Sequence, residues 1–380
     1  MTIVDVEIAM LDAGYLRSTL FQQRLASPMS AFAEFAANRA LWMWPSEKVI
    51  TILRDKDGVE GVSITNGGRV VATILHDQFA RLIRGRAADD IAEIWEILVR
   101  SSLPFDRSGY AMMAVAAVDI ALWDMKSKRE RQTLTTLTGG VRNRDLRAYV
   151  TTGVPERFAQ TAFSGIKVPI PGGPHDGPDG VAENIAIVRR AREAAGDDRD
   201  VMIDAFMAWD VDYTLRMFEA LQPYRVRWFE DPLPPNNIRD FEALKRAGGD
   251  ALHLALGNFS FSRWDCNELL SAGVVSVLQP DIAWCGGVTE ALRIVALANM
   301  RQTDVIFHNT SEQPWALALS QSQPGVCEVE YVDRDSDSML HQLFEGGASV
   351  IGARVIDDGT VGHSLSSRAR GAMTAFEPSR

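Results

Sequence analysis

The chain has 380 residues, of which 46% are hydrophobic and 23% charged, as is ordinary for a soluble globular protein. That length exceeds one average domain and fits a barrel with a smaller partner domain. The formal net charge of −11 argues against a nucleic-acid partner, since no Lys/Arg-rich face offsets it. The longest apolar stretch, 111–123, contains Asp119 and is too short to span a membrane.

The cysteines and the N-terminus bear on the compartment. Cys266, Cys285 and Cys327 are odd in number and scattered, so neither a disulfide framework nor a cysteine metal site is expected. The N-terminus has no basic start and no cleavage site, so no signal peptide is expected. We therefore expect a reduced, cytoplasmic protein without a membrane partner.

The first part of the chain predicts an α+β domain over residues 1–145. Residues 4–13 alternate as a strand, and 47–66 predict a hairpin that turns at 56–58. Between them, 16–39 is a long polar segment without a clean period, which is typical of a functional loop. Helical patterns then dominate up to about Gly140, including 88–101 and 111–128.

From residue 148, apolar runs of strand length alternate with helical patterns, which predicts right-handed βαβ units and a parallel barrel. The expected strands are 148–153, 165–170, 201–206, 226–231, 252–258, 275–282, 305–309 and 327–332. The expected helices are 180–196, 210–221, 237–248, 262–273 and 287–302. The expected fold class is therefore α/β. A modified (β/α) TIM-type barrel (146–335) carries the site behind an N-terminal α+β capping domain, to which a tail from about 336 to 380 returns.

Polar residues stand at the ends of these apolar runs, where every strand of a parallel barrel faces the same mouth. They are Asp204, Glu230, Asn258, Asp281 and His308, together with Glu328 in the run CEVE. One pattern thus gathers carboxylates, an amide and an imidazole in one pocket. That layout is typical of metal-assisted proton abstraction.

Asp204 and Glu230 end consecutive strands and carry the oxygen ligands that Mg²⁺ prefers. Acidic residues at strand ends can also cap the next helix, but Glu230 follows Trp228 and Phe229 in a buried strand, and a buried Glu needs a cation or a strong partner. An amide oxygen of Asn258 could be a third ligand without charge, and a helix N-cap is an equal alternative for it.

Asp281 and His308 end the next two strands. A carboxylate bonded to the imidazole Nδ1–H fixes the tautomer and raises the basicity of Nε2, so His308 is a candidate base rather than a structural histidine. Lys167 points to the same mouth and is a possible second group. Glu328 could contact a substrate or merely hold a loop. The Cys285–Gly287 turn lacks the Lys or the glycine pattern of a phosphate cradle.

Several long motifs resemble the enolase superfamily, and within it the mandelate racemase-like acid-sugar dehydratases of rhamnonate dehydratase type. They are SPMSAFAEFAANR (27–39), AVAAVDIALWD (114–124), KVPIPGGPHDG (167–177), MIDAFMAWDVDY (202–213), WFEDPLPP (228–235) and LQPDIAWCGGVT (278–289). The His308–Glu328 spacing also fits. The resemblance covers nearly the whole chain.

The resemblance implies a Mg²⁺ cofactor held by Asp204 and Glu230, with Asn258 at the third ligand position. It implies that His308, oriented by Asp281, removes the α-proton of an L-rhamnonate-like sugar acid and that loss of the 3-hydroxyl gives a 2-keto-3-deoxy acid. Arg39, Lys167 and Glu328 would bind this small-molecule substrate, and a homo-oligomer is expected.

The chain departs from the family pattern in two places, and from the racemases of the superfamily in a third. The third ligand is ordinarily Glu or Asp, so Asn258 should weaken Mg²⁺ binding. Leu16 falls near a substrate-contacting His of the rhamnonate dehydratases, so the sugar can differ. Lys-Val-Pro at Lys167 replaces the Lys-x-Lys of racemases and disfavours a 1,1-proton transfer. A racemase or epimerase of the same superfamily, and a non-enzymatic binding protein with a degenerate site, stay open as alternatives.

Overall fold

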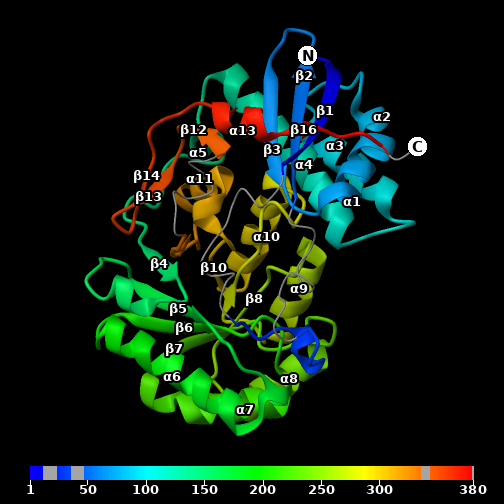
Figure 1. The fold of residues 1–380 in the computed structure, drawn as a ribbon. Coiled ribbons are helices and arrows are strands. Elements are labelled where there is room, and N and C mark those ends of the chain that lie inside the picture. The colour runs from blue at the N-terminus through cyan, green and yellow to red at the C-terminus, as the bar shows by residue number, and fades with distance from the viewer. Residues whose placement is uncertain (12–23, 36–46, 335–342, 379–380) are drawn as a thin grey trace.

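The computed structural model describes residues 1–11, 24–35, 47–334 and 343–378, in which a small antiparallel sheet with helices sits beside a parallel barrel (Figure 1). Arg39 and Leu16 lie outside the described residues. The α/β fold class expected from the sequence is confirmed. Among the described residues, every helix is too short or too polar to cross a membrane.

The smaller sheet is antiparallel and combines the two ends of the chain. Its strand order is β16-β1-β2-β3, and the register aligns Ala9 with Ala375. The strands are β1 (Ile3–Leu11), β2 (Lys48–Asp55), β3 (Glu60–Thr65) and β16 (Thr374–Ala375). The helices beside them are α1 (Gly68–Thr73), η5 (Ile74–Phe79), α2 (Ala80–Ile83), α3 (Ile91–Ser102), α4 (Gly109–Glu130) and α5 (Leu134–Leu137). The last strand of the chain therefore completes the first sheet.

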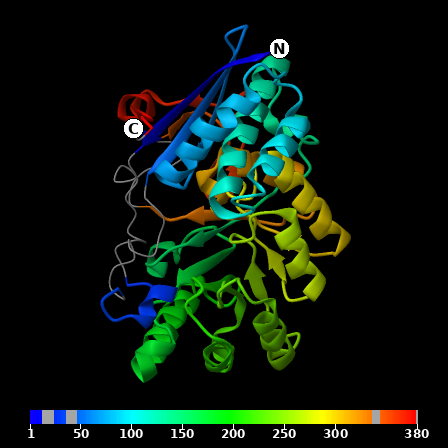
Figure 2. The ribbon, with the colours of Figure 1, turned by 90° about the vertical axis from the view of Figure 1, so that its right-hand side faces the viewer.

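The larger sheet is parallel and has the order β10-β9-β8-β7-β6-β5-β4-β11, with a bridge between Val305 and Val326 that links its two edges. Its strands are β4 (Ala148–Thr151), β5 (Gly165–Pro169), β6 (Asp200–Asp204), β7 (Val226–Glu230), β8 (Leu254–Leu256), β9 (Val277–Leu278), β10 (Asp304–Val305) and β11 (Val329–Val332). The helices between them are α6 (Gly177–Ala195), α7 (Val211–Leu221), α8 (Ile238–Gly248), α9 (Arg263–Ala272), α10 (Val288–Met300) and α11 (Pro314–Ser322). Figure 2 shows these helices around the strands.

Side chains, not solvent, fill the lower part of the barrel. An inner apolar cluster comes from alternate positions of the strands: Tyr149, Met202, Trp228, Ala255, Val277 and Ile306. A second cluster, which includes Val168, Ile203 and Phe229, packs the outer strand faces against the helices. Because apolar side chains fill the lower interior, the barrel mouth is lined by the polar side chains at the strand ends.

The two parts of the protein are joined where α4 meets the start of α10. Asp119 on α4 accepts a hydrogen bond from the backbone N of Thr289 at 3.0 Å and so caps α10 from another element. Gly287 has φ of +91°, and a Cβ there would lie 2.4 Å from the Asp119 carboxylate. The Cys285–Gly287 turn thus allows the close approach of α4, which is its structural role.

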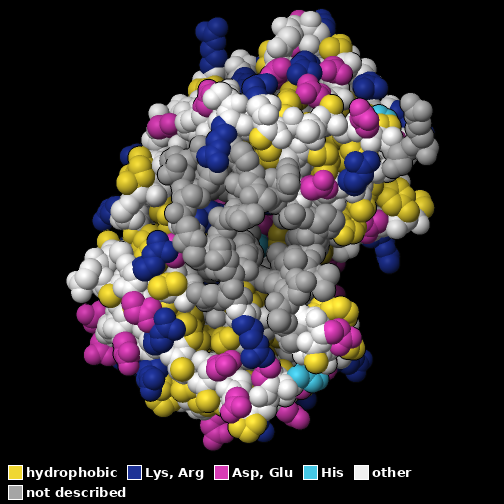
Figure 3. Space-filling model, in the orientation of Figure 1, with side chains coloured by type: hydrophobic (Ala, Val, Ile, Leu, Met, Phe, Trp, Pro, Cys, Tyr) yellow, Lys and Arg dark blue, Asp and Glu magenta, His cyan; other side chains and the backbone are white. Residues whose placement is uncertain are grey.

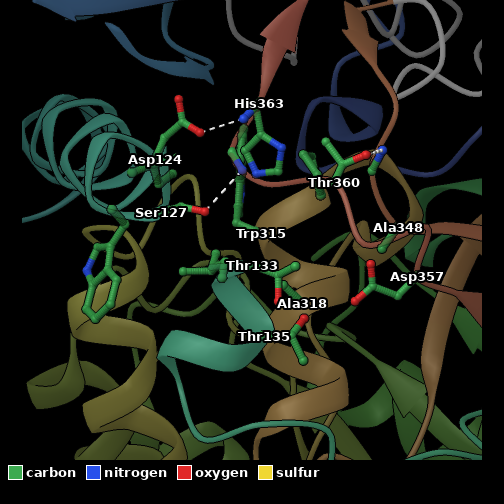
Figure 4. A pocket seen from close by; sticks show the side chains of 16 residues that line it. Asp124, Ser127, Thr133, Thr135, Trp315, Ala318, Ala348, Asp357, Thr360 and His363 are labelled. Carbon is green, nitrogen blue, oxygen red and sulfur yellow. Dashed lines mark hydrogen bonds between the residues drawn. The ribbon is translucent and has the colours of Figure 1, made fainter. Parts of the chain in front are cut away.

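The C-terminal tail is hydrogen-bonded to the second half of α4. The backbone N of His363 donates to Asp124 at 2.6 Å, and that of Gly362 donates to Ser127 at 3.0 Å. The His363 ring also packs edge-on against Trp315 of α11. These contacts line a small pocket between the tail, α4 and α11 (Figure 4). The tail therefore links the capping helices to the barrel.

The surface carries both signs of charge. On the face in Figure 3, the described Lys and Arg side chains are interspersed with Asp and Glu. On this face, the described Lys and Arg side chains do not form a continuous basic track.

We predict that Gly287→Ala destabilises the protein more than Gly249→Ala does. Both glycines have positive φ, which costs a residue with a Cβ about 1–2 kcal/mol. Around Gly249 there is open space, whereas at Gly287 the added methyl meets Asp119, and such overpacking costs about a further 1–3 kcal/mol. Thermal and denaturant unfolding measure the difference. Equal losses would show that α4 moves away at little cost.

Candidate functional site

The ends of β5, β6 and β7 place Asp204 and Glu230 side by side at the barrel mouth. The parallel register aligns Pro169 with Asp204, and Asp204 with Glu230. Both carboxylates are buried, with 5% and 1% of their residue surface exposed. Burial, followed by the charge of Glu230, raises the pKa of Asp204 to about 7. The carboxylates of Asp204 and Glu230 thus carry more negative charge than the surrounding cations offset.

Lys167 on β5 is the cation that faces this pair. Its Nζ lies 2.6 Å from Glu230, 2.8 Å from Glu330 and 4.0 Å from Asp204, with only 1% of its side chain exposed. Burial alone would lower the pKa of Lys167, but Glu230 and Glu330 outweigh it and raise the pKa well above its ordinary value. Lys167 therefore holds its proton in this structure and acts as a buried ammonium.

Glu330, and not Glu328, is the carboxylate that β11 brings to the pocket. Besides Lys167, Glu330 accepts hydrogen bonds from Thr151 Oγ1 on β4 and from the backbone N of Asn309 at 2.7 Å. Burial opposes its charge, but Lys167 and His308 lower the pKa of Glu330 to about 2. Glu330 is thus an ionised neighbour of both candidate proton-transfer groups.

The placement of Glu328 in the pocket, expected from the sequence, is wrong. Glu328 precedes β11 and pairs with Arg227, which also binds Asp200 at 2.9 Å. Arg227 and Asp200 lie at the starts of β7 and β6, so this ion-pair group closes the opposite end of the barrel. Glu330, the second residue of β11, is the carboxylate of this strand that contacts Lys167.

Asn258 follows β8 and has a side-chain oxygen without a partner. Its Oδ1 is buried, and no donor among the described residues bonds to it. Such an orphaned acceptor costs free energy unless something binds it. Together with Asp204 and Glu230 it makes an all-oxygen donor set, which suits Mg²⁺. Among the described residues, no group of three His, Cys, Asp or Glu side chains is placed so that it could hold a metal ion.

His308 and Asp281 form the hydrogen-bonded pair expected from the sequence. Nδ1 of His308 lies 2.9 Å from Oδ2 of Asp281. The other oxygen of Asp281 accepts from the backbone N of Ala283 at 2.9 Å and from Gln313 at 3.0 Å, so the carboxylate cannot rotate freely. The ring of Trp284 packs at 5.0 Å from the imidazole. Nε2 is left as the nitrogen that can take a proton.

The charges of the pocket act on this pair. Burial alone would lower the pKa of His308, but the hydrogen bond and the charge of Asp281 raise it above its ordinary value. Glu330 adds to this rise, and Lys167 opposes it. The imidazole is therefore tuned as a stronger base than a free histidine.

Left-handed backbone recurs where the strands end at the site. Positive φ occurs at Phe206 (+48°) after Asp204, at Asp231 (+38°) after Glu230, at Gly257 (+137°) before Asn258 and at Asn309 (+51°) after His308. Such conformations are uncommon for residues with a Cβ and cluster at functional sites. At each of these strand ends the chain therefore changes direction within two residues of the polar side chain.

Other polar groups at the site did not stand out in the sequence. Gln279 donates to the second oxygen of Glu230 at 3.0 Å, and Gln313 holds Asp281. Asp231 is buried beside Glu230. Gln279 ends an apolar run, so the strand-end pattern contained a signal for it, whereas Gln313 lies at the start of α11 and gives none.

The segment before the second strand also reaches the mouth. Residues 24–35 lie against the barrel, where the backbone N of Ala26 donates to Ile170 O at 2.9 Å, directly after β5. Arg24 forms an ion pair with Asp176 in the following loop. Part of the long polar segment 16–39 thus lies next to the strand that carries Lys167.

Family comparisons agree with this geometry. The description "Enolase C-terminal domain-like" matches residues 151–367, and "Mandelate racemase / muconate lactonizing enzyme, N-terminal domain" matches residues 44–139. The chain is similar to L-rhamnonate dehydratase of Saccharopolyspora erythraea, with 32% identity over 298 residues that cover 78% of this chain and 76% of that protein.

Two solved structures are similar over almost the full chain. One is L-rhamnonate dehydratase from Gibberella zeae, with 25% identity, a TM-score of 0.89 and coverage of 98% of this chain and 96% of the other. The second is L-talarate/galactarate dehydratase from Salmonella typhimurium LT2 liganded with Mg and L-lyxarohydroxamate. It has 25% identity, a TM-score of 0.78 and coverage of 98% and 92%.

We predict that Asp281→Asn lowers the pKa of His308. The substitution removes the charge and the acceptor that together raise it, while burial, which lowers it, stays. An NMR titration of the histidine side chains, with His308→Ala to assign the signal, measures the shift. Asp265→Asn, at the start of α9, is the control that should leave this pKa unchanged. An unaltered His308 pKa in Asp281→Asn would contradict the pairing.

Proposed function

The chain belongs to the mandelate racemase/muconate lactonizing enzyme family of the enolase superfamily, and we propose that it is a Mg²⁺-dependent hydro-lyase that dehydrates a sugar acid, L-rhamnonate or a close analogue. The observation that carries the proposal is that Glu330 joins the two halves of the site: it contacts Lys167, which faces Asp204 and Glu230, and it also accepts from the backbone N of Asn309, next to the His308–Asp281 pair. Similarity to two sugar-acid dehydratases, one of them liganded with Mg, supports the reaction class.

The proposed roles follow from where each group lies. Asp204, Glu230 and the Asn258 amide oxygen would hold Mg²⁺, and a bound Mg²⁺ would supply positive charge to the substrate carboxylate as its α-proton is lost. Lys167, as a buried ammonium, would bind the same carboxylate. This requires Lys167 to exchange part of its contact with Glu230 or Glu330 for the substrate.

His308 would act first as the base and then as the acid. Nε2 takes the α-proton, and Asp281 stabilises the imidazolium that forms. The electron pair left at the α-carbon forms the double bond as the 3-hydroxyl leaves, and the proton on Nε2 goes to that oxygen, so that water is released. The enol product then becomes the 2-keto-3-deoxy acid by taking a proton at C3 and releasing the proton of its 2-hydroxyl to solvent.

The geometry favours dehydration over racemisation. A 1,1-proton transfer needs a base on each face of the α-carbon. Lys167 is the candidate for the second face, but it is ion-paired with two carboxylates and its pKa is raised well above its ordinary value. A group held protonated in this way is a poor base. Dehydration needs only His308.

We predict that the protein converts an acid sugar to a 2-keto-3-deoxy product in the presence of Mg²⁺. We also expect His308→Ala to lower the rate of this conversion by a factor of about 10²–10⁴. A screen of acid sugars with Mg²⁺ that detects 2-keto-3-deoxy acids is the measurement. Exchange of the α-proton with deuterated solvent, without elimination, would indicate an epimerase instead. Absence of both exchange and elimination over the whole screen would favour the non-enzymatic binding protein.

We also predict that Glu330→Gln lowers turnover by at least tenfold, whereas Glu328→Gln changes it by less than about twofold. Removal of the Glu330 charge disturbs Lys167, Asn309 and His308 together, and supporting residues of a metal site typically contribute about 10–100-fold. Glu328 lies at the other barrel end with Arg227. The two variants make the same chemical change two residues apart in the chain, so kcat at saturating Mg²⁺ compares them directly. A larger loss in Glu328→Gln would contradict the assignment.

A further inference from the structure

Gln313 contacts both members of the His308–Asp281 pair. Its Nε2 donates to Oδ1 of Asp281 at 3.0 Å and, in a longer contact of 3.5 Å, to the backbone O of His308. Only 6% of Gln313 is exposed, so its amide meets the protein and not water. Pro314 follows it and confines its backbone to the extended region, where φ is −134° and ψ is 109°. The amide therefore starts from a fixed backbone.

Trp315 holds the other end of this amide. Its indole Nε1 donates to Oε1 of Gln313 at 2.8 Å. An indole N–H can only donate and a carboxylate can only accept, so one orientation of the amide satisfies both neighbours. The Trp315 ring is 2% exposed and packs edge-on against Phe344 at 5.9 Å and His363 at 6.1 Å (Figure 4). Residues of the C-terminal tail thus hold the indole in place.

The carboxylate of Asp281 has open space beside it. A cavity of about 40 Å³ is lined by Asp281, Gln313 and Trp315 among other residues, and it is large enough for a water molecule. Packing alone therefore does not prevent rotation of the carboxylate. Its Oδ1 is held by two donors, the backbone N of Ala283 at 2.9 Å and Gln313, which leaves Oδ2 directed at His308.

We propose that Gln313 is a positioning residue of the proton-transfer pair and that Trp315 acts through it. The two side chains form a hydrogen-bonded chain from α11 to Asp281. This chain keeps Oδ2 of Asp281 on Nδ1 of His308 and so leaves Nε2 free for the proton. The inference rests on the proposed role of His308 as the base, but not on the identity of the sugar acid or on the metal ligands.

The kinetics of Gln313→Leu test the proposal. We expect kcat to fall at least about tenfold, as part of the 10²–10⁴-fold that a positioned base contributes. The KM should change by less than about twofold, because the base acts in the transition state. Gln321→Leu is the matched control: it lies on the same helix, is also 6% exposed, and its Oε1 has no partner among the described residues. It should leave kcat unchanged.

Trp315→Phe tests whether the indole acts through the amide. It keeps an aromatic ring against Phe344 and His363 but removes the N–H. Alone it should lower kcat by about threefold or more, whereas in the Gln313→Leu background it should change kcat by less than about twofold, because the group it acts through is gone. The double variant also leaves no unpaired indole N–H, so it serves if Gln313→Leu alone folds poorly.

An NMR titration of His308 without Mg²⁺ or substrate gives a readout that a merely structural role would not change. The hydrogen bond and charge of Asp281 raise the pKa of His308, Glu330 adds to this rise, and Lys167 opposes it. In Gln313→Leu the Asp281 contact loosens while the charges of Glu330 and Lys167 stay, so we expect the pKa of His308 to fall.

Three results would overturn the inference alone. The first is a His308 pKa that is unchanged or raised in Gln313→Leu, because Asp281 would then keep its place without the amide. The others are a loss of kcat no larger than that of Gln321→Leu, and losses that multiply in the double variant. A wild-type protein that dehydrates no acid sugar would overturn the proposed function, and the titration of His308 would still decide on the positioning.

Discussion

The site depends on the burial of four carboxylates around one ammonium. Asp204, Glu230, Asp231 and Glu330 are at most 6% exposed, and Lys167 is the cation placed among them. Burial of charges costs free energy unless each is paired, and Lys167 contacts Glu230 and Glu330 closely but Asp204 only at 4.0 Å. The pKa of Asp204 is raised to about 7, first by burial and then by Glu230, which shows that negative charge is in excess. The proposed Mg²⁺, held by these carboxylates, would offset this excess.

The sequence predicted the fold and most of this cluster, for a physical reason. Parallel strands bring every carboxyl end to one mouth, so a polar residue at the end of an apolar run is placed by topology alone. That rule was sufficient for the neighbouring positions of Asp204 and Glu230 and for the contact of His308 with Asp281. This rule requires only the positions of the strand ends, and the ends of the apolar runs in the sequence indicate those positions well.

The rule failed where the strand itself was misplaced or where the backbone left the strand. The run CEVE begins two residues before β11 enters the sheet at Val329, so Glu328 was assigned to the mouth although it lies at the barrel floor. Asp231 was missed because alternation would direct it away from Glu230, and only its left-handed φ reverses that. Such a turn depends on contacts with Ala255 and Met207, which are far away in sequence. The positive φ of Asn309 and of Phe206 could not be predicted either, since nothing in the neighbouring sequence requires it.

The capping region acts on the site through the strand-end loops and not through the barrel core. Asp119 caps α10 immediately after the loop that begins at Asp281, and Gly287 permits that contact. The glycines of the Cys285–Gly287 turn, which lack the pattern of a phosphate cradle, thus have a packing role.

Reaction chemistry and substrate choice are consequently built from different parts of the chain. The groups that would hold the metal and move the proton come from strand ends between β5 and β11, where backbone hydrogen bonds and buried charges fix them. The described residues 24–35 of the N-terminal segment reach the mouth through contacts such as Ala26 with Ile170 and Arg24 with Asp176. Loops on a rigid scaffold are where specificity usually varies. In the proposed enzyme, changes in that segment would therefore alter which sugar acid fits without disturbing the charge balance around Lys167.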